Sequence, residues 1–215
     1  MKKVLFLGIF STLLIVVPLH AFDFVILKYK NGDSYNARNG VQHFLTELGR
    51  RTTIETVLEP LELSLEDSAV FQHSFLFLNG HVPIYLTPKE KQNLKRYLEN
   101  GGFLFANDDY GMDESFRKLI TTLFPDNPIK EVPYTHEVYH TFYQFDNGIP
   151  KIHEHYDGKP YAYGLFINGR LAVFYTYNTD IADGWDDASV HQDPANKRES
   201  AIQMGVNIVV YALTR

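Results

Sequence analysis

The sequence contains no cysteine among its 215 residues. No disulfide can form, thiolate chemistry is excluded, and so is a lipoprotein anchor on an N-terminal cysteine. An exported chain without disulfides fits a bacterial periplasm better than a eukaryotic extracellular space, where disulfides are common. The cellular compartment of this chain is therefore predicted mainly from its N-terminal residues.

Basic residues are scarce relative to acidic ones. The chain has 20 Lys and Arg against 26 Asp and Glu, and its net charge is −6 with neutral histidines. No basic stripe or cluster is present, which argues against nucleic acid or anionic lipid as a partner. The sequence also has no Walker loop, no G-x-G-x-x-G turn and no G-x-S-x-G elbow, so nucleotide cofactors and serine nucleophiles gain no support.

The one long apolar run lies near the N-terminus. Residues 1–21, MKKVLFLGIFSTLLIVVPLHA, contain two lysines, an apolar stretch from Val4 to Val17 and a small residue at Ala21. This is the pattern of a secretory signal peptide, and the stretch is short for a membrane span. We expect cleavage after Ala21, with an uncleaved N-terminal anchor as the alternative. Residues 22–215 are then expected to form one domain without a membrane span, because no linker or repeat divides them.

Short apolar segments alternate with helical patterns in the first half of the chain. Residues 23–29, 52–57, 74–79 and 103–106 are expected to be strands, and residues 37–50 a helix. The 74–79 segment is apolar on both faces, which is typical of a central parallel strand. Strand–helix alternation with short connections predicts right-handed crossovers and a doubly wound, mostly parallel α/β sheet.

Helix signals are clearest between the last two of these strands. Thr87 is placed as an N-cap, Pro88 as the first helical residue and Glu90 as the partner in a capping box, and Gly101-Gly102 ends the helix. A further helix is expected from Asp113, as its cap, to about residue 124.

The second half of the chain adds a hairpin and a helix. Residues 161–167 and 171–177 are strand-like and are joined by Asn168-Gly169-Arg170, a strong hairpin signal. Residues 198–213 are apolar nearly all round, which predicts a buried C-terminal helix. The hairpin is expected as an addition to the parallel sheet.

Three segments resemble a known family: residues 75–81 (FLFLNGH), 86–111 (LTPKEKQNLKRYLENGGFLFANDDYG) and 205–215 (GVNIVVYALTR). They resemble the domain-of-unknown-function family numbered 4159, over nearly all of residues 22–215. The resemblance implies an exported protein with a flavodoxin-like fold of the class I glutamine-amidotransferase or ThuA type, and it implies no activity. An active amidotransferase would carry a cysteine at a strand-to-helix turn, so glutamine hydrolysis by a thiolate is excluded here.

Polar residues follow several of the expected strands. In an open α/β sheet, ligands bind outside the carboxyl ends of the strands, where residues 79–81, 107–109 and 177–180 are expected to converge. Candidate ligand-binding residues there are His81, Asp108, Asp109 and Asp180. For the paired aspartates the alternative is a cap or turn role, and for His81 a structural hydrogen bond.

The segment THEVYHTFY, residues 135–143, contains the string H-E-x-x-H. A zincin needs His136 and His140 one helical turn apart, with Glu137 as the base and a third ligand downstream. The segment is rich in β-formers, and a downstream ligand at metzincin spacing, with its glycine turn, is missing. We therefore disfavour a zincin, and the resemblance implies a family role for the two histidines without Glu137. Two hypotheses remain: His136 and His140 line a ligand or divalent-metal site, or they are packed structurally.

Two further patterns carry weaker signals. His153 and His155 would face the same side of a strand and chelate a metal, or else lie in an exposed loop. Trp185, in the acidic loop 178–187, would stack on a sugar ring or instead cover the edge of the core.

The leading hypothesis is an exported protein of the Gram-negative cell envelope, expected in the periplasm. It would be a non-catalytic ligand-binding or protein-interaction module, with a small molecule or an envelope protein as its partner. The alternative is a metal-dependent hydrolase that uses Asp108, Asp109, His136 and His140. The sequence identifies neither a cofactor nor a catalytic residue.

Overall fold

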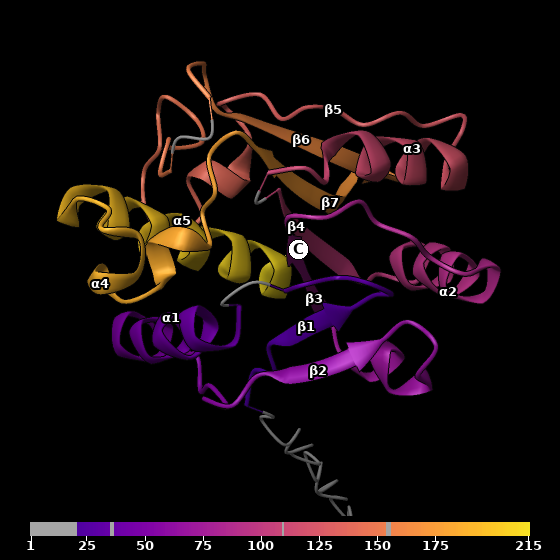
Figure 1. The fold of residues 1–215 in the computed structure, drawn as a ribbon, viewed down its shortest axis with the longest axis horizontal. Coiled ribbons are helices and arrows are strands. Elements are labelled where there is room, and N and C mark those ends of the chain that lie inside the picture. Colours follow the sequence, from indigo (N-terminus) through magenta and orange to yellow (C-terminus); the bar gives the residue numbers. More distant parts are fainter. Residues whose placement is uncertain (1–20, 35–36, 109, 154–155) are drawn as a thin grey trace, which may run out of the picture.

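The computed structural model describes residues 21–34, 37–108, 110–153 and 156–215. A seven-stranded, mostly parallel sheet runs through the middle of the molecule in the order β2-β1-β3-β4-β7-β6-β5 (Figure 1). The first five strands in this order are parallel, and β6 and β5 add antiparallel pairs at one edge. The strands are β1 Val25–Lys28, β2 Leu61–Ser64, β3 Phe75–Gly80, β4 Phe103–Asp108, β5 Lys130–Glu131, β6 Tyr161–Ile167 and β7 Arg170–Tyr177.

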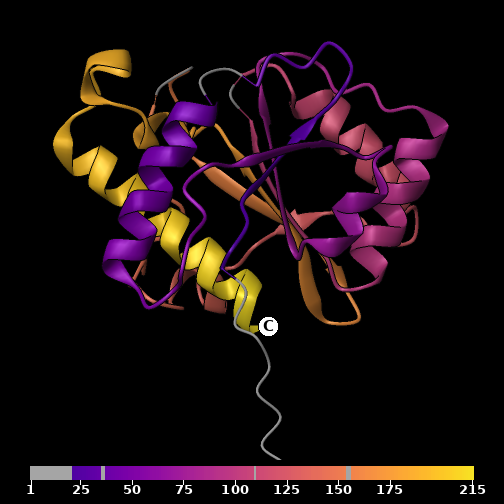
Figure 2. The ribbon, with the colours of Figure 1, turned by 90° about the horizontal axis from the view of Figure 1, so that it is seen from below.

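Helices cover both faces of the sheet. Helices α1 and α5 lie on one face and α2 and α3 on the other (Figure 2). Each face has its own apolar cluster, one including the rings of β3 and β4 and the other including Leu76, Leu104 and the inner side of α2. The helices are α1 Ala37–Arg51, α2 Pro88–Glu99, α3 Asp113–Leu123, α4 Ala188–His191 and α5 Ala195–Thr214, and the short 3-10 turns are η1 Ser68–Gln72, η2 Glu137–Tyr139 and η3 Asp183–Trp185. The predicted mixed α/β fold is confirmed.

Local signals in the sequence fix several of these boundaries. The Thr87 hydroxyl accepts the Glu90 N–H (3.2 Å), and the Glu90 carboxylate accepts the Thr87 N–H (2.7 Å), so the capping box that starts α2 is confirmed. The hairpin turn has positive φ angles at Asn168 (51°) and Gly169 (82°), as the Asn-Gly signal requires. Helix α5 buries nine of its residues, as predicted for the C-terminal segment.

Three predicted features differ. Residues 52–57 form only an isolated bridge, Phe22 to Thr56, and the edge strand lies at Leu61–Ser64, where two of its four residues are exposed. An exposed edge strand carries little apolar signal, which is why the pattern missed it. The hairpin is not simply an appendage, because β7 is the fifth parallel strand and pairs with β4. Asp113 is the first residue of α3 rather than its cap, since Met112 precedes it without a side-chain cap bond.

Aromatic packing joins α1, α5 and the sheet. Trp185 is 1% exposed and stacks on Phe44 at 4.4 Å between ring centroids, with Phe77 at 5.6 Å. Its indole N–H donates to the Ala201 carbonyl of α5 (3.1 Å). A ring buried in this way packs the core and satisfies its one donor.

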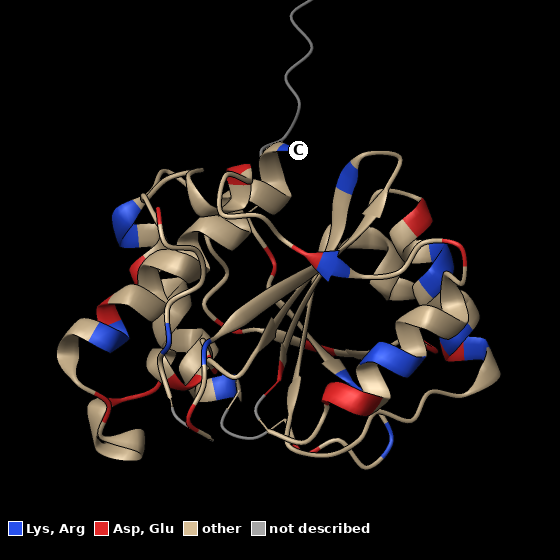
Figure 3. Ribbon diagram, turned by 90° about the horizontal axis from the view of Figure 1, so that it is seen from above, with Lys and Arg blue, Asp and Glu red and all other residues tan. Residues whose placement is uncertain are grey.

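Charged residues are mixed along the outer helices, with blue and red segments interspersed (Figure 3). This agrees with the absence of a basic stripe in the sequence. Within the described residues, no helix is long and apolar enough to cross a membrane.

The segment containing the two candidate histidines is held to α5 by one buried amide. Asn207 is 0% exposed; its Oδ1 accepts the N–H groups of Phe142 (3.1 Å) and Tyr143 (2.7 Å), and its Nδ2 donates to the Tyr143 carbonyl (2.9 Å). We expect Asn207→Ala to lower the free energy of unfolding by about 2–4 kcal/mol, because it leaves three backbone groups without partners. Denaturant unfolding monitored by circular dichroism measures this. Gln203→Ala, on the same helix, should change it by less than about 0.5 kcal/mol; equal effects would contradict the role of Asn207.

Candidate functional site

The carboxyl ends of β3, β4 and β7 lie side by side, as the sequence predicts, and one side chain links them. Asn107 Nδ2 donates to Asn79 Oδ1 (2.7 Å) and to Asp180 Oδ1 (2.9 Å). Asn107 Oδ1 accepts the Thr176 hydroxyl (3.0 Å) and the Ile181 N–H (3.0 Å). Both donors and both acceptor positions of the amide are therefore used, which fixes three strand ends and the loop after β7.

Asp108 is the last residue of β4 and is 4% exposed. Its Oδ1 accepts the Met112 N–H (2.9 Å), so the carboxylate closes the turn that leads into α3. Burial raises the pKa of Asp108 to about 6, backbone hydrogen bonds oppose the shift, and the carboxylates of Asp113 and Asp180 add to it. A buried carboxylate of this kind gains energy from any cation that reaches it.

The turn after Asp108 has an unusual backbone. Tyr110 has a φ of 84°, a region that bulky residues rarely adopt, and its side chain is 59% exposed. Gly111 follows with a φ of 117°, and a Cβ there would overlap the His81 carbonyl. Strain of this kind collects at binding sites, and here it holds the Tyr110 ring at the carboxyl edge.

A cavity of about 320 Å³ opens at this edge, between the end of β4 and the end of β7. We call it the tyrosine–carboxylate pocket. The rings of Tyr156 and Tyr177 lie 6.0 Å apart at its rim, and Tyr156 is 41% exposed. The complete lining is Asp108, Tyr110, Gly111, Asp113, Glu114, Tyr156, Tyr177 and Asn178.

The three carboxylates of this pocket differ in their partners. Asp113 accepts the Arg117 Nε–H (2.7 Å) and the Tyr175 hydroxyl (2.7 Å), so a guanidinium offsets its charge. Among the described residues, neither Asp108 nor Glu114 forms an ion pair with a Lys or Arg. Lys151 lies beside the pocket, where its ammonium donates to Asn178 Oδ1 (2.7 Å) and to the Tyr156 carbonyl (3.1 Å). Lys151 Nζ also lies 5.5 Å from the Tyr156 ring centroid, and the Arg117 guanidinium carbon lies 5.7 Å from that of Tyr177. Protein cations therefore already lie near two of the rings, whereas the Asp108 and Glu114 carboxylates have no basic partner among the described residues.

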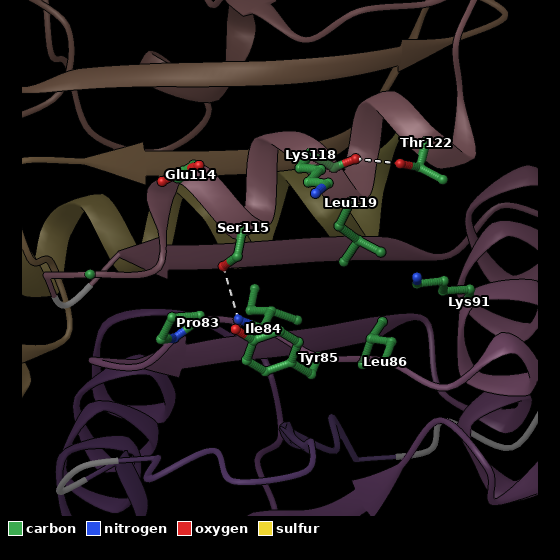
Figure 4. Close-up of a pocket in the computed structure, with 11 residues that line it drawn as sticks. Pro83, Ile84, Tyr85, Leu86, Lys91, Glu114, Ser115, Lys118, Leu119 and Thr122 are labelled. Atoms are coloured by element: carbon green, nitrogen blue, oxygen red, sulfur yellow. Dashed lines mark hydrogen bonds between the residues drawn. The ribbon is translucent and has the colours of Figure 1, made fainter.

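A second cavity, of about 390 Å³, adjoins the first and shares Gly111 and Glu114 with it. It lies between α3 and the segment before α2 (Figure 4). We call it the α2–α3 groove.

His81 lies near this edge but faces a different partner. Its Nδ1–H donates to Asp33 Oδ2 (3.0 Å), and its backbone N–H donates to Asp33 Oδ1 (3.1 Å). His81 is absent from the pocket lining, although its carbonyl packs against Gly111. It supports the turn that carries Tyr110.

Asp180 and Trp185 lie beneath the surface in the loop after β7. Asp180 is 0% exposed and has a φ of 50°; its Oδ1 accepts from Asn107 and also from the Asp183 N–H (3.3 Å). Trp185 packs in the core, so its ring is not available to stack on a sugar. Burial, followed by the carboxylates of Asp180, Asp193 and Asp186, raises the pKa of Asp183. The His191 ring lies between two of these acids, with its Nε2 3.0 Å from Asp186 Oδ2 and 3.3 Å from Asp183 Oδ1.

The histidine pair of the H-E-x-x-H string lies at the other end of the sheet. Residues 137–139 form a single 3-10 turn rather than the α-helix that a zincin requires. The His136 ring packs on Phe166, beside the β6–β7 turn, and on Tyr211, with centroids 5.6 Å and 5.4 Å away. His136 Nδ1 accepts the Val138 N–H (3.2 Å), which caps the turn.

Both ring nitrogens of His140 are also engaged. Nε2 lies 2.8 Å from the Tyr134 carbonyl and Nδ1 lies 2.9 Å from Gln144 Oε1. Glu137 pairs with Arg215 (2.5 Å). The predicted pocket of His136 and His140 together with Asp108 is therefore not assembled, because the string lies at the amino end of the parallel strands and Asp108 at their carboxyl end.

Of the other candidate pair, His153 is described, and its Nδ1 lies 3.6 Å from Asp193 Oδ1 and 4.0 Å from Asp183 Oδ2. Within the described ranges, no group of three or more His, Asp or Glu side chains is arranged to hold a metal ion. Asp109 and His155, two of the predicted candidates, lie outside the described residues.

Sequence reasoning found Asp108 and missed most of its neighbours. Tyr177 lies within the predicted segment 177–180, and Tyr110 directly follows the predicted segment 107–109, so this closeness in sequence was the available signal. Tyr156 and Glu114 come from elsewhere in the chain, and only the fold brings them to the pocket.

A family model described as a domain of unknown function (DUF4159) matches residues 23–213. No curated protein matches the chain.

The ionised Asp108 carboxylate lowers the free energy of unfolding. Its pKa is raised from 3.8 to about 6, so the native state binds its proton more tightly than the unfolded chain. Stability from this group is present below about pH 4 and is lost as the pH rises through 6. We expect Asp108→Asn, which keeps the Oδ1 acceptor for Met112, to raise stability at pH 8 by up to about 3 kcal/mol, the equivalent of the pKa shift. Thermal unfolding should show the gain at pH 8 and little gain at pH 4; a loss at pH 8 would contradict this assignment.

Proposed function

The chain belongs to the DUF4159 family, a domain of unknown function, and we propose from its own geometry that it binds a small organic cation without transforming it. The site is the tyrosine–carboxylate pocket. The observation that supports this is the pairing of Asp108 and Glu114, two carboxylates without a basic partner among the described residues, with three tyrosine rings around one cavity.

Charge and aromatic faces favour a cation over other ligands. An organic cation near a tyrosine face gains about 0.5–2 kcal/mol from the ring, and more where water is excluded. Asp108 adds a buried carboxylate whose ionised form a cation would stabilise. An anion would meet three carboxylates and no lining Lys or Arg. A compact ammonium group therefore suits the cavity.

The lining supports binding rather than catalysis. It contains no histidine, serine or lysine, and Asp108 is already bonded to the turn that it closes. Asp113 is likewise occupied by Arg117 and Tyr175. The hydrolase hypothesis gains no support from the described residues, because His136 and His140 lie away from Asp108 and are hydrogen-bonded locally.

The scaffold fits a degenerate amidotransferase-like protein with a flavodoxin-like sheet. Its five parallel strands follow the order β2-β1-β3-β4-β7, which corresponds to the flavodoxin order 2-1-3-4-5 when β7 is counted as the fifth strand. In that fold, ligands bind at the carboxyl edge, where the tyrosine–carboxylate pocket lies. We also propose that residues 22–215 form a single domain.

Calorimetric titration of residues 22–215 with choline tests the binding. We expect saturable binding with a dissociation constant on the order of 1 mM or below, about −4 kcal/mol or stronger. Asp108→Asn and Glu114→Gln should each weaken it about tenfold by removing a carboxylate. Affinity should fall as the pH drops through about 6, since Asp108 then takes up a proton. The Asp108→Asn variant should lose that pH dependence.

Two controls separate this from non-specific binding. The uncharged carbon analogue of choline, dimethylbutanol, has a similar shape and should bind much more weakly. Glu131→Gln changes an exposed carboxylate on β5, outside the pocket lining, and should leave choline affinity unchanged. Equal binding of choline and dimethylbutanol, or equal effects of Glu131→Gln and Glu114→Gln, would refute the cation site.

Export to the periplasm is the second part of the proposal, and it rests on the N-terminal pattern of residues 1–21. Cleavage after Ala21 would leave Phe22 as the first residue. Phe22 is 7% exposed, and its backbone nitrogen, which cleavage would turn into the terminal ammonium, lies 2.7 Å from the Glu55 carbonyl oxygen. We expect the mature protein, expressed in a Gram-negative host, to begin at Phe22 by mass spectrometry and to be released with the periplasmic fraction. A cytoplasmic protein that still begins at Met1 would contradict export.

A further inference from the structure

Two lysines line the α2–α3 groove, whereas the charged side chains that line the tyrosine–carboxylate pocket beside it are all acidic. Lys91 of α2 and Lys118 of α3 both line the groove, one from each helix (Figure 4). On the same helices Lys95 pairs with Glu99 (2.9 Å) and Arg117 with Asp113 (2.7 Å). Lys89 and Arg96 of α2 have no acidic partner among the described residues, but neither lines the groove. In the described part of the chain, Lys91 and Lys118 form no ion pair with an Asp or Glu.

The floor of the groove is apolar. Ile84 and Leu119 are 6% and 5% exposed, and Leu86 borders them. Tyr85 stands at the rim and is 63% exposed. The Ser115 hydroxyl is occupied, because it accepts the Ile84 N–H (2.8 Å) and donates to the Met112 carbonyl (2.8 Å). The two lysines are therefore the groups at which an incoming polar group finds complementary charge.

The groove and the tyrosine–carboxylate pocket meet at Gly111 and Glu114. Gly111 has no side chain to block the way, and its φ of 117° together with the packing of His81 disfavours any other residue there. A ligand with its cationic end among the tyrosines can therefore continue past Gly111 along the apolar floor.

From this arrangement we infer that the ligand is an elongated zwitterion. An ammonium group occupies the tyrosine–carboxylate pocket, an apolar spacer lies over Leu119, and a carboxylate reaches Lys91 and Lys118. Lysine binds a carboxylate as a point charge, so two lysines on separate helices define its position without demanding one orientation. This inference rests on the proposed cation site and adds the second half of the ligand.

The test compares three kinds of probe by calorimetric titration: tetramethylammonium, hexanoate, and a series of trimethylammonio-alkanoates of increasing spacer length. We expect the best zwitterion to bind at least about tenfold more tightly than tetramethylammonium, because the two linked ends add their contacts at high effective concentration. The double variant Lys91→Gln/Lys118→Gln should abolish this advantage and any hexanoate binding, and leave tetramethylammonium affinity unchanged. Lys89→Gln, on the same helix α2 but outside the groove lining, is the matched control.

The outcomes separate the two proposals. Failure of every zwitterion to exceed tetramethylammonium overturns the inference and leaves the cation site standing. An advantage that survives in the double variant overturns it as well, since the lysines then do not hold the carboxylate. If tetramethylammonium and every zwitterion fail to bind, both the cation site and the zwitterion inference fall, even where hexanoate binds through Lys91 and Lys118.

Discussion

The buried amide of Asn107 is the constraint on which the carboxyl edge of this sheet depends. Its four hydrogen bonds connect the ends of β3, β4 and β7 to the loop that carries Asp180 and Ile181. Buried polar groups are expensive unless fully paired, so this amide tolerates little displacement of any partner. With the strand ends fixed, Asp108 must leave the sheet where it does, and the chain must turn at once into α3.

That turn places a buried carboxylate and an exposed tyrosine ring at the tyrosine–carboxylate pocket. Asp108 closes the turn with its carboxylate, and burial raises its pKa. Tyr110 adopts a strained backbone and keeps its ring in solvent. Burial of the Asp108 carboxylate and the positive φ of Tyr110 both lower stability, as features of binding sites often do. A bound cation, as proposed, would offset the cost of the buried carboxylate. The acidic loop after β7 has a different role, because it places Trp185 where its ring stacks on Phe44 of α1 and its N–H donates to the Ala201 carbonyl of α5.

Much of the fold was predictable, because its signals are local. The capping box at Thr87 and Glu90, the apolar runs of β3 and β4, and the Asn-Gly hairpin turn each depend on a few adjacent residues. Strand β2 was not predictable by the same reasoning, since an exposed edge strand needs little apolar sequence. Asp108 followed from its place after a strand. The spacing of His136 and His140 did not predict their arrangement. Residues four positions apart face the same side only in an α-helix, and residues 137–139 form a single 3-10 turn. Tyr156 and Glu114 meet only through the packing of distant segments.

The most direct test of the cation site is a crystal structure of residues 22–215 grown with tetramethylammonium or a bromine-labelled ammonium analogue. The account predicts the ammonium group between the rings of Tyr110, Tyr156 and Tyr177, within contact of the Asp108 and Glu114 carboxylates. An ammonium bound elsewhere, or an empty pocket at a concentration that saturates the protein in solution, would contradict it.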